Sequence, residues 1–450
     1  MRWCFFAGVL AGIVSFISCE PETGHILIDT GQDEIAHETP AVDEPPVSYV
    51  APDGFEVTPF SHDPLWAFAK GGTDSISVSS LEPWNVSYDS EWLSLSSSEG
   101  GSGVSVVRIT TRPNTGESAR NAKLLFSVGD GRLEYELTQF PDIFKRHAHI
   151  LLKVHSSLVI RYDSTRFSRI YSVIPVPHTD QYQTVTRVGL FAGAFPGLCA
   201  DGHNMYAVSD ISGDIPKSGR EVNSCVFNAE LNMVETDFQR IGKIQAYDTE
   251  APEYLRYTSR DSCDGRVIVD PLNQDILRIS DELWMRSEMN ILSYARMCYE
   301  WTARNLTYGD AFTGLHPVEE IMRSRRGDCG AFTSVYVSLL RAKGIPARHL
   351  LMISPLDGYH IRAEFYLSGY GWIPVDPTFK NSNPSRDYFG NNSGRHIVVS
   401  HGICTEVEGP FGPCVIDGLQ QYYWWAWRSE GDRSYDVQHQ VSLLGMEGPA

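Results

Sequence analysis

Three residues in the last third of the chain have the types and spacing of a nucleophilic cysteine site. Cys329 follows Asp328 at the expected start of a helix, where unpaired backbone N–H groups and the helix dipole favour a thiolate. His360 and Asp376 lie in two short segments that predict neighbouring strands. A thiolate, an imidazole base and an acid that orients the imidazole together perform acyl transfer. The three residues therefore predict attack on a carbonyl carbon and a covalent acyl-enzyme.

Helices are predicted on both sides of the candidate nucleophile. Apolar residues recur at helical spacing over residues 287–305, and a proline opens a second, shorter helix over 317–326. From Cys329 the same spacing runs for about four turns and stops at Gly344. This last helix is apolar along most of its length, so we expect it to be buried.

A hairpin is predicted to bring the base and the acid together. Residues 360–367 alternate as a strand, a turn follows, and 372–376 form the returning strand. If the hairpin is centred on Ser368, His360 lies directly opposite Asp376 and within side-chain reach.

The motifs around these residues resemble the transglutaminase-like core of the papain-like cysteine superfamily. They are Gly-Asp-Cys-Gly at 327–330, Leu-Arg-Ala-Lys-Gly-Ile-Pro-Ala-Arg at 340–348, His-x-x-x-Glu at 360–364 and Gly-Trp-Ile-Pro-Val-Asp-Pro-Thr at 371–378. The resemblance implies a catalytic triad of Cys329, His360 and Asp376 with no metal and no cofactor. Arg362 departs from the pattern, because many members carry Trp at that position.

Three functional classes are compatible with these residues. We favour a peptidase or amidohydrolase, in which water accepts the acyl group. A transglutaminase, which joins a Gln carboxamide to a Lys amine, and a non-catalytic glycan- or mucin-binding surface protein are the alternatives.

Trp301 and Tyr308 are the candidate side-chain donors to an oxyanion, in addition to the Cys329 backbone N–H. The expected substrate is a protein, peptide or glycoprotein.

The first fifty residues predict export and a lipid anchor. Residues 1–18 hold one basic residue and an apolar stretch that is typical of a secretory signal and short for a spanning helix. The stretch ends in Phe-Ile-Ser-Cys, which resembles a bacterial lipobox with Cys19 as the lipidated residue. An ordinary signal cleaved nearby is the alternative. Residues 19–50 are acidic, contain prolines and read as a linker. We expect the protein at the outer membrane or surface of a Gram-negative bacterium, held by the lipid alone.

Composition limits the remaining classes. The 450 residues suffice for about three domains. The 37 basic and 56 acidic residues give a net charge of −19, which excludes nucleic acid as a partner. The expected fold is therefore multidomain: an all-β sandwich over 51–141, a second β domain over 144–280 and an α+β transglutaminase-like catalytic domain over 281–450.

The predicted sandwich has its own resemblance. Its short alternating runs are separated by Gly-rich turns. Its markers are Trp84 with Asn85 and Val86, Trp92 with Leu93, a Gly-Gly-x-Gly turn, Asn114, Arg120 with Ala122, and the closing run 137–139. They resemble a BACON domain, a module of Bacteroidetes surface proteins, which implies carbohydrate or mucin contact. Trp84 and Trp92 are the candidate sugar-stacking residues, although core packing is the commoner role of such tryptophans.

Two further expectations concern the end of the chain and the cysteines. The aromatic run 422–427 predicts a buried strand packed against the catalytic sheet. Apart from the residues lost or lipidated at the N-terminus, seven cysteines remain, so at least one thiol stays free. Because each pair closes a polar, Gly-rich loop, the candidate disulfides are Cys199–Cys225 and Cys404–Cys414.

Overall fold

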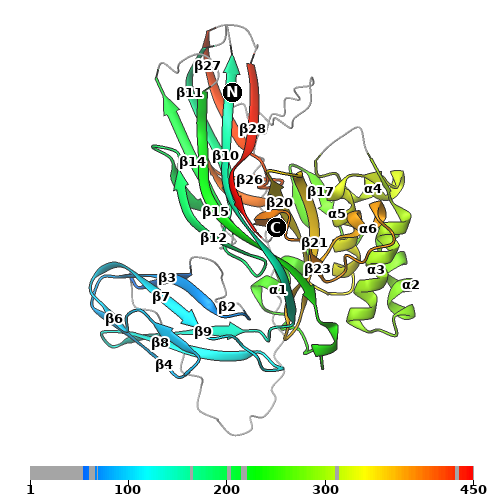
Figure 1. Cartoon of the computed structure of the whole chain (residues 1–450), viewed down its shortest axis with the longest axis horizontal. Helices are drawn as coiled ribbons and strands as arrows, with labels where there is room; N and C mark the ends of the chain where they lie inside the picture. Colours follow the sequence, from blue (N-terminus) through cyan, green and yellow to red (C-terminus); the bar gives the residue numbers. More distant parts are fainter. Residues whose placement is uncertain are drawn as a thin grey trace, which may run out of the picture.

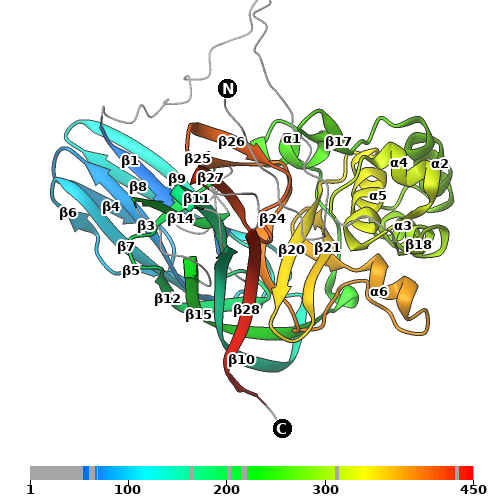
Figure 2. The same cartoon turned by 90° about the horizontal axis from the view of Figure 1, so that it is seen from above.

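The computed structural model describes residues 54–448 except 60–65, 68, 163–165, 200–203, 214–219, 310–313 and 431–434. The predicted signal, Cys19 and the acidic linker lie outside these residues. The described chain forms an N-terminal β sandwich, a second β unit of two long curved sheets and an α+β unit whose helices lie on the far side from the sandwich (Figures 1 and 2). None of the helices in these ranges is long and apolar enough to cross a membrane.

The N-terminal unit is a sandwich of two sheets, as the alternating runs predict. Alternate residues of the strands point inward and are mostly apolar, so the two inner faces form one core, although Val104 and Val106 lie on an outer face. One sheet has the order β1 (Glu56–Pro59), β3 (Gly72–Ser80), β7 (Gly103–Thr111), β5 (Leu93–Leu95). The other has the order β2 (Trp66–Ala67), β9 (Gly131–Gln139), β8 (Arg120–Val128), β4 (Trp84–Tyr88), β6 (Glu99–Gly100).

The two candidate sugar-stacking tryptophans serve the sandwich itself. Trp84 is only 2% exposed and packs against Phe126 in the core, so its face cannot meet a sugar. Trp92 is half-buried, and the Arg120 guanidinium lies 4.5 Å from its ring centre. The glycan-stacking hypothesis is wrong for Trp84, and Arg120 already occupies the ring of Trp92.

The second β unit combines strands from the middle of the chain with two strands from its last thirty residues. Its first sheet has the order β12 (Gln183–Leu190), β15 (Arg220–Thr236), β10 (Phe144–Tyr162), β28 (Tyr435–Glu447). Its second sheet has the order β13 (Phe195–Leu198), β14 (Met205–Ser212), β11 (Arg166–Val176), β27 (Tyr423–Glu430). The prediction that 281–450 form one catalytic domain is therefore wrong at its end, because β27 pairs with β11 and β28 pairs with β10.

The α+β unit is built on an antiparallel sheet of order β22 (Gly371–Val375), β21 (Gly358–Leu367), β20 (Ala347–Ser354), β24 (Ile397–His401). Its helices are α1 (Pro252–Thr258), α2 (Gln274–Arg286), α3 (Ile291–Asn305), α4 (Val318–Ser324), α5 (Cys329–Arg341) and α6 (Pro377–Ser382). The predicted boundary at 280 falls inside α2, which buries Ile276, Ile279 and Leu283 in the same core as α5.

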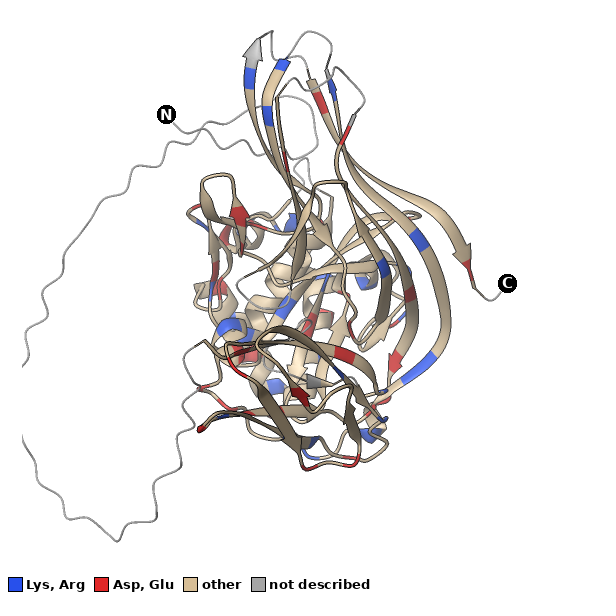
Figure 3. Ribbon diagram, turned by 90° about the vertical axis from the view of Figure 1, so that its left-hand side faces the viewer, with Lys and Arg blue, Asp and Glu red and all other residues tan. Residues whose placement is uncertain are grey.

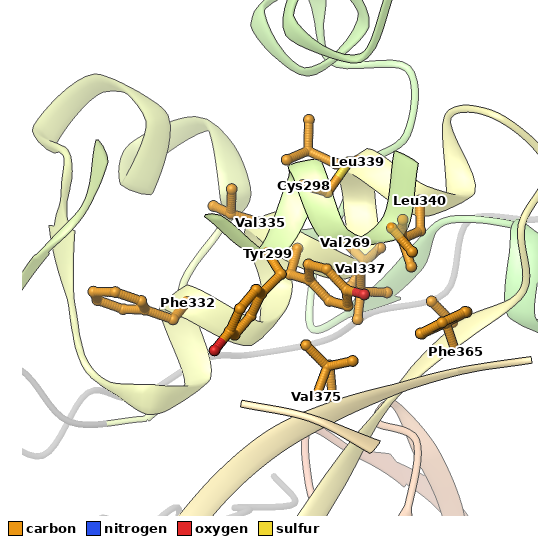
Figure 4. Packing of buried hydrophobic residues seen from close by; sticks show 14 of the residues in the cluster. Val269, Cys298, Tyr299, Phe332, Val335, Val337, Leu339, Leu340, Phe365 and Val375 are labelled. Atoms are coloured by element: carbon orange, nitrogen blue, oxygen red, sulfur yellow. The ribbon is translucent and has the colours of Figure 1, made fainter. Parts of the chain in front are cut away.

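Helix α5 is the centre of this unit. Every residue from Gly330 to Arg341 is buried, and its apolar side chains meet α3 on one side and the sheet on the other (Figure 4). The opposite face of the sheet packs on the second β unit through Ile353, Ile397 and Val399. The sheet of this unit is therefore enclosed between helices and a second β structure, which holds its residues rigidly.

Charged residues are interspersed over the strands and helices (Figure 3). Several form cross-strand pairs on exposed faces, such as Lys123 with Glu134 at 2.6 Å and Arg169 with Asp210 at 2.7 Å. Pairs this exposed add little to stability, so the cores carry the fold.

Both predicted disulfides are wrong. No disulfide joins any of the seven cysteines within the described ranges. Cys225 lies in the core between the two long sheets, whereas Cys199 lies in a separate cluster on the outer side of the second sheet. Cys414 lies opposite Val407 in the antiparallel pair of β25 (Thr405–Gly409) and β26 (Gly412–Ile416), whereas Cys404 precedes β25, so Cys404 and Cys414 are not cross-strand partners.

The aromatic run is buried as predicted, but its partner differs. Trp425 is 6% exposed and meets Tyr171 of β11 edge-on, with 5.7 Å between ring centres. Trp424 on the opposite face meets Phe167 in the core between the long sheets. The run therefore closes the second β unit instead of the catalytic sheet.

Replacing Trp425 by Ala should lower the free energy of unfolding by about 3–5 kcal/mol, because the cavity left between β27 and its neighbours cannot collapse fully. Thermal and urea denaturation would measure the loss. Trp427→Ala is the matched control and should cost less, since Trp427 is only half-buried beneath Arg169. A Trp425→Ala protein with an unchanged melting temperature would contradict the packing role.

Candidate active site

Cys329 lies at the first position of α5 because Asp328 caps that helix. The Asp328 Oδ1 accepts the N–H of Gly330 at 2.9 Å and that of Ala331 at 3.2 Å. The cap does not use the N–H of Cys329, so this N–H of the first helical turn can donate to another acceptor. Cys329 is half-buried while the rest of α5 is buried. Gly327 is required just before the cap, since a Cβ there would lie 2.2 Å from the Cβ of Ala331.

His360 and Asp376 form a buried hydrogen-bonded pair. The His360 Nε2 lies 2.6 Å from the Asp376 Oδ2, and both side chains are less than a tenth exposed. The predicted register is wrong by two residues, because β21 and β22 pair Ala363 with Val375. The acid still reaches the imidazole, since Asp376 lies just past β22 and caps α6, where its Oδ1 accepts the Phe379 N–H at 2.9 Å.

The charges of this pair stabilise each other. Burial disfavours the imidazolium of His360, but Asp376 and a hydrogen bond with Cys329 outweigh it and raise its pKa to about 10. Burial also disfavours the Asp376 carboxylate, but His360 and the helix N–H lower its pKa below the usual value. Because Nε2 is bonded to Asp376, Nδ1 is the nitrogen left for Cys329. The structure therefore brings together all three predicted triad residues.

The His360 ring is held between aromatic side chains. Phe379 stacks on it at 4.4 Å with 7° between the planes, and His396 lies 5.3 Å away between ring centres. Burial, together with the nearby charge of His360, lowers the pKa of His396 to about 3, so His396 stays neutral. Gln420 fixes the backbone, donating to the carbonyl of His360 at 3.0 Å and to that of Met352 at 2.9 Å.

Behind the site, a buried ion pair joins β20 to β21. Arg348 and Glu364 are cross-strand partners, and their charged atoms lie 2.6 Å apart. Tyr182 of the second β unit donates to Glu364 at 3.0 Å, and the Arg348 guanidinium lies 3.9 Å from the Trp372 ring centre. The motif residue Glu364 thus supports the catalytic strand and lies outside the reacting centre.

Arg362 borders the far side of the triad. It is 3% exposed, donates to the Asn392 Oδ1 at 2.9 Å and lies over the Tyr182 ring at 5.0 Å. With His360, Asp376 and Asn392 it lines a cavity of about 10 Å³, which has room for about one water molecule. The residue that departs from the family pattern is therefore a buried cation beside Asp376.

The two oxyanion candidates differ in position. Tyr308 lies in the two-residue strand β18 (Thr307–Tyr308), which pairs with β19 (Arg326–Gly327). The residue that caps α5, Asp328, directly follows β19. Burial and the proximity of Cys329 raise the pKa of Tyr308, so its hydroxyl remains a donor. Trp301 lies on α3 with Arg325 5.1 Å from its ring centre. Tyr308 therefore lies near Cys329, whereas the ring of Trp301 faces Arg325, so the structure favours Tyr308 over Trp301.

Sequence reasoning missed the residues that surround the triad. Gln420 and His396 come from segments far along the chain, and no local motif marks either of them. Asn392 belongs to β23 (Asn391–Asn392), which is too short to be predicted. No group of three or more His, Cys, Asp or Glu side chains able to hold a metal occurs within the ranges that the structure covers.

Comparison with known proteins gives two family matches. Residues 279–377 match the transglutaminase-like superfamily core. Residues 82–138 match the BACON family, described as a candidate N-terminal binding domain. An uncharacterized protein of Haemophilus influenzae is 27% identical in an alignment of 239 residues that covers 45% of this chain and 62% of that protein.

Matches to solved structures are of low similarity. A candidate cysteine protease from Cytophaga hutchinsonii is 13% identical, with a TM-score of 0.40 over 68% of this chain and 91% of that one. The periplasmic domain of TgpA from Pseudomonas aeruginosa is 12% identical, with a TM-score of 0.30 over 68% of this chain and 90% of that one. With the two family matches and the triad geometry, the chain is identified as a multidomain protein with a transglutaminase-like superfamily core behind a BACON domain.

Proposed function

We propose that the protein is a cysteine acyl-transfer enzyme that cleaves amide bonds, with Cys329 as nucleophile, His360 as acid and base and Asp376 as the residue that orients His360. One observation carries the proposal: the buried 2.6 Å bond between His360 and Asp376, next to a thiol at a helix start. A buried imidazole held in one tautomer beside a thiol is the arrangement that activates a cysteine.

The proposed reaction has two halves. The Cys329 thiolate attacks the amide carbonyl carbon, and the developing oxyanion accepts the Cys329 N–H and the Tyr308 hydroxyl. The C–N bond breaks as His360 passes its proton to the leaving amine, which leaves a thioester on Cys329. His360 then removes a proton from water, the thioester is hydrolysed, and the thiolate returns. Water is the proposed acceptor, because it needs no second binding groove.

The substrate is tested by incubating the mature chain with casein and mucin, with and without a labelled amine. We expect new peptide fragments and no incorporated label. Cys329→Ala and His360→Ala should abolish cleavage, and Asp376→Ala should retain more activity, because it removes orientation and not a reacting group. Cys298→Ala is the matched control, since that thiol is buried in α3 away from the triad.

Label incorporation without fragments would overturn hydrolysis in favour of cross-linking. Glycan retention with neither product, by wild type and Cys329→Ala alike, would favour a binding protein.

The pH profile tests the pair itself. Because the His360 pKa lies near 10, its imidazolium persists at neutral pH and is lost as the pH rises through about 10. We expect the cleavage rate to fall along that alkaline limb. Asp376→Asn removes the charge that stabilises the imidazolium, so the alkaline limb should shift to a lower pH by roughly 1 to 3 pH units. Asp275 is an exposed acid on α2, and Asp275→Asn should leave the alkaline limb at the same pH. An unmoved limb in Asp376→Asn would contradict the assignment.

We also propose export and membrane attachment through a lipid on Cys19. The support is the apolar segment, the lipobox-like end and the acidic linker in the sequence. Cys19→Ala should move the protein from the membrane fraction to the soluble fraction of lysed cells. Membrane association that survives this substitution would refute the anchor.

A further inference from the structure

Two cysteines outside the triad lie side by side in the α+β unit. Cys263 ends β16 (Asp261–Cys263) and is 4% exposed, and Cys404 precedes β25 (Thr405–Gly409). Their side chains are hydrogen-bonded to each other, although roughly 140 residues separate them along the chain. Both pack against the hydrophobic cluster that contains α5.

Contacts that involve no sulfur join the same two segments. Arg266 of β17 (Arg266–Val269) faces Cys263 across the β16–β17 pair and donates to the Asp417 carboxylate at 3.2 Å. The carbonyl of Asp417 accepts the N–H of Cys404 at 3.1 Å. Asp417 therefore holds both cysteine-bearing segments in one place, so the meeting of the thiols is part of a wider set of contacts.

The backbone at Cys404 is also unusual. Its φ is 54°, in the left-handed region that residues with a Cβ rarely adopt. Such a conformation persists only where its surroundings fix it, and here it follows Gly402, another residue at positive φ. The turn directs this segment back towards β16.

We propose that Cys263 and Cys404 form a disulfide bond in the mature protein. The oxidant is a disulfide, either of a thiol–disulfide oxidoreductase or of glutathione. One cysteine, as thiolate, attacks the oxidant and forms a mixed disulfide, and the second displaces it. The two cysteine thiols lose two electrons and two protons, which reduce the oxidant to two thiols. The inference does not rest on the proposed peptidase activity.

The bond would fix the surroundings of the triad. It closes the stretch of chain that contains α5, β21 and the start of α6, and such long closures stabilise most. It also anchors the base of the hairpin β25–β26 (Gly412–Ile416), directly before the segment from which Gln420 bonds the His360 carbonyl. The predicted partner of Cys404 was wrong, but the proposed one lies beside it.

Peptide mapping tests the bond directly. The full mature chain carrying Cys329→Ala is equilibrated with glutathione disulfide, unfolded in N-ethylmaleimide and digested without reductant. We expect one linked peptide pair joining Cys263 to Cys404, with Cys298 labelled as the internal free thiol. The link should also form in Cys414→Ser. Labelling of both Cys263 and Cys404, or a link from Cys404 to Cys414, would overturn the proposal.

Stability gives a second measure. In the oxidised protein, Cys263→Ser and Cys404→Ser should each lower the melting temperature by roughly 5 to 10 °C, and the double variant should lose no more than either. Additive losses from the two single variants would contradict a shared bond, because independent residues contribute separately.

Discussion

A buried ion pair between Arg348 and Glu364 fixes where the catalytic strand lies. The two are direct partners across β20 and β21, and Tyr182 satisfies Glu364 from the neighbouring β unit. Removing one partner would leave a charge buried without compensation, which costs far more than the pair itself contributes. A shift of β21 by one residue relative to β20 would also separate the two charges, so the pair fixes the register of these strands. His360 lies four residues along β21 and takes its position from that register.

The triad then comes from two helix starts and one strand. Asp328 places Cys329 by capping α5, and Asp376 caps α6 with one oxygen while it holds His360 with the other. Helix caps are local devices with fixed geometry, so each side chain is positioned by only a few bonds. The connection that leads into β27 adds Gln420, which holds the His360 backbone from outside the sheet.

Local signals in the sequence predicted the three residues that the structure brings together, Cys329, His360 and Asp376, and the strands of the sandwich. The cap of α5 and the strand alternation depend on neighbours a few residues apart, so they are visible in one sequence. Features that depend on distant pairing were not predictable: the return of β27 to β11 and the meeting of Cys263 with Cys404. The register of the β21–β22 hairpin was missed because its turn is centred one residue later than predicted, on Gly369 at positive φ. Helix α2 was missed although Asn273 caps it and Ile276, Ile279 and Leu283 have helical spacing, so its signal was present.

The pairing of β27 and β28 with much earlier strands affects the order in which the protein can fold during synthesis. Since β28 completes the sheet of β10, the α+β unit is an insertion within one β structure and not a module added after it. A ribosome therefore finishes the thiol-bearing helix about a hundred residues before the strands that close the neighbouring sheet. Until those residues emerge, β10 and β11 expose edges that invite wrong pairing. A partly synthesised chain therefore carries these open strand edges until β27 and β28 are available to cover them.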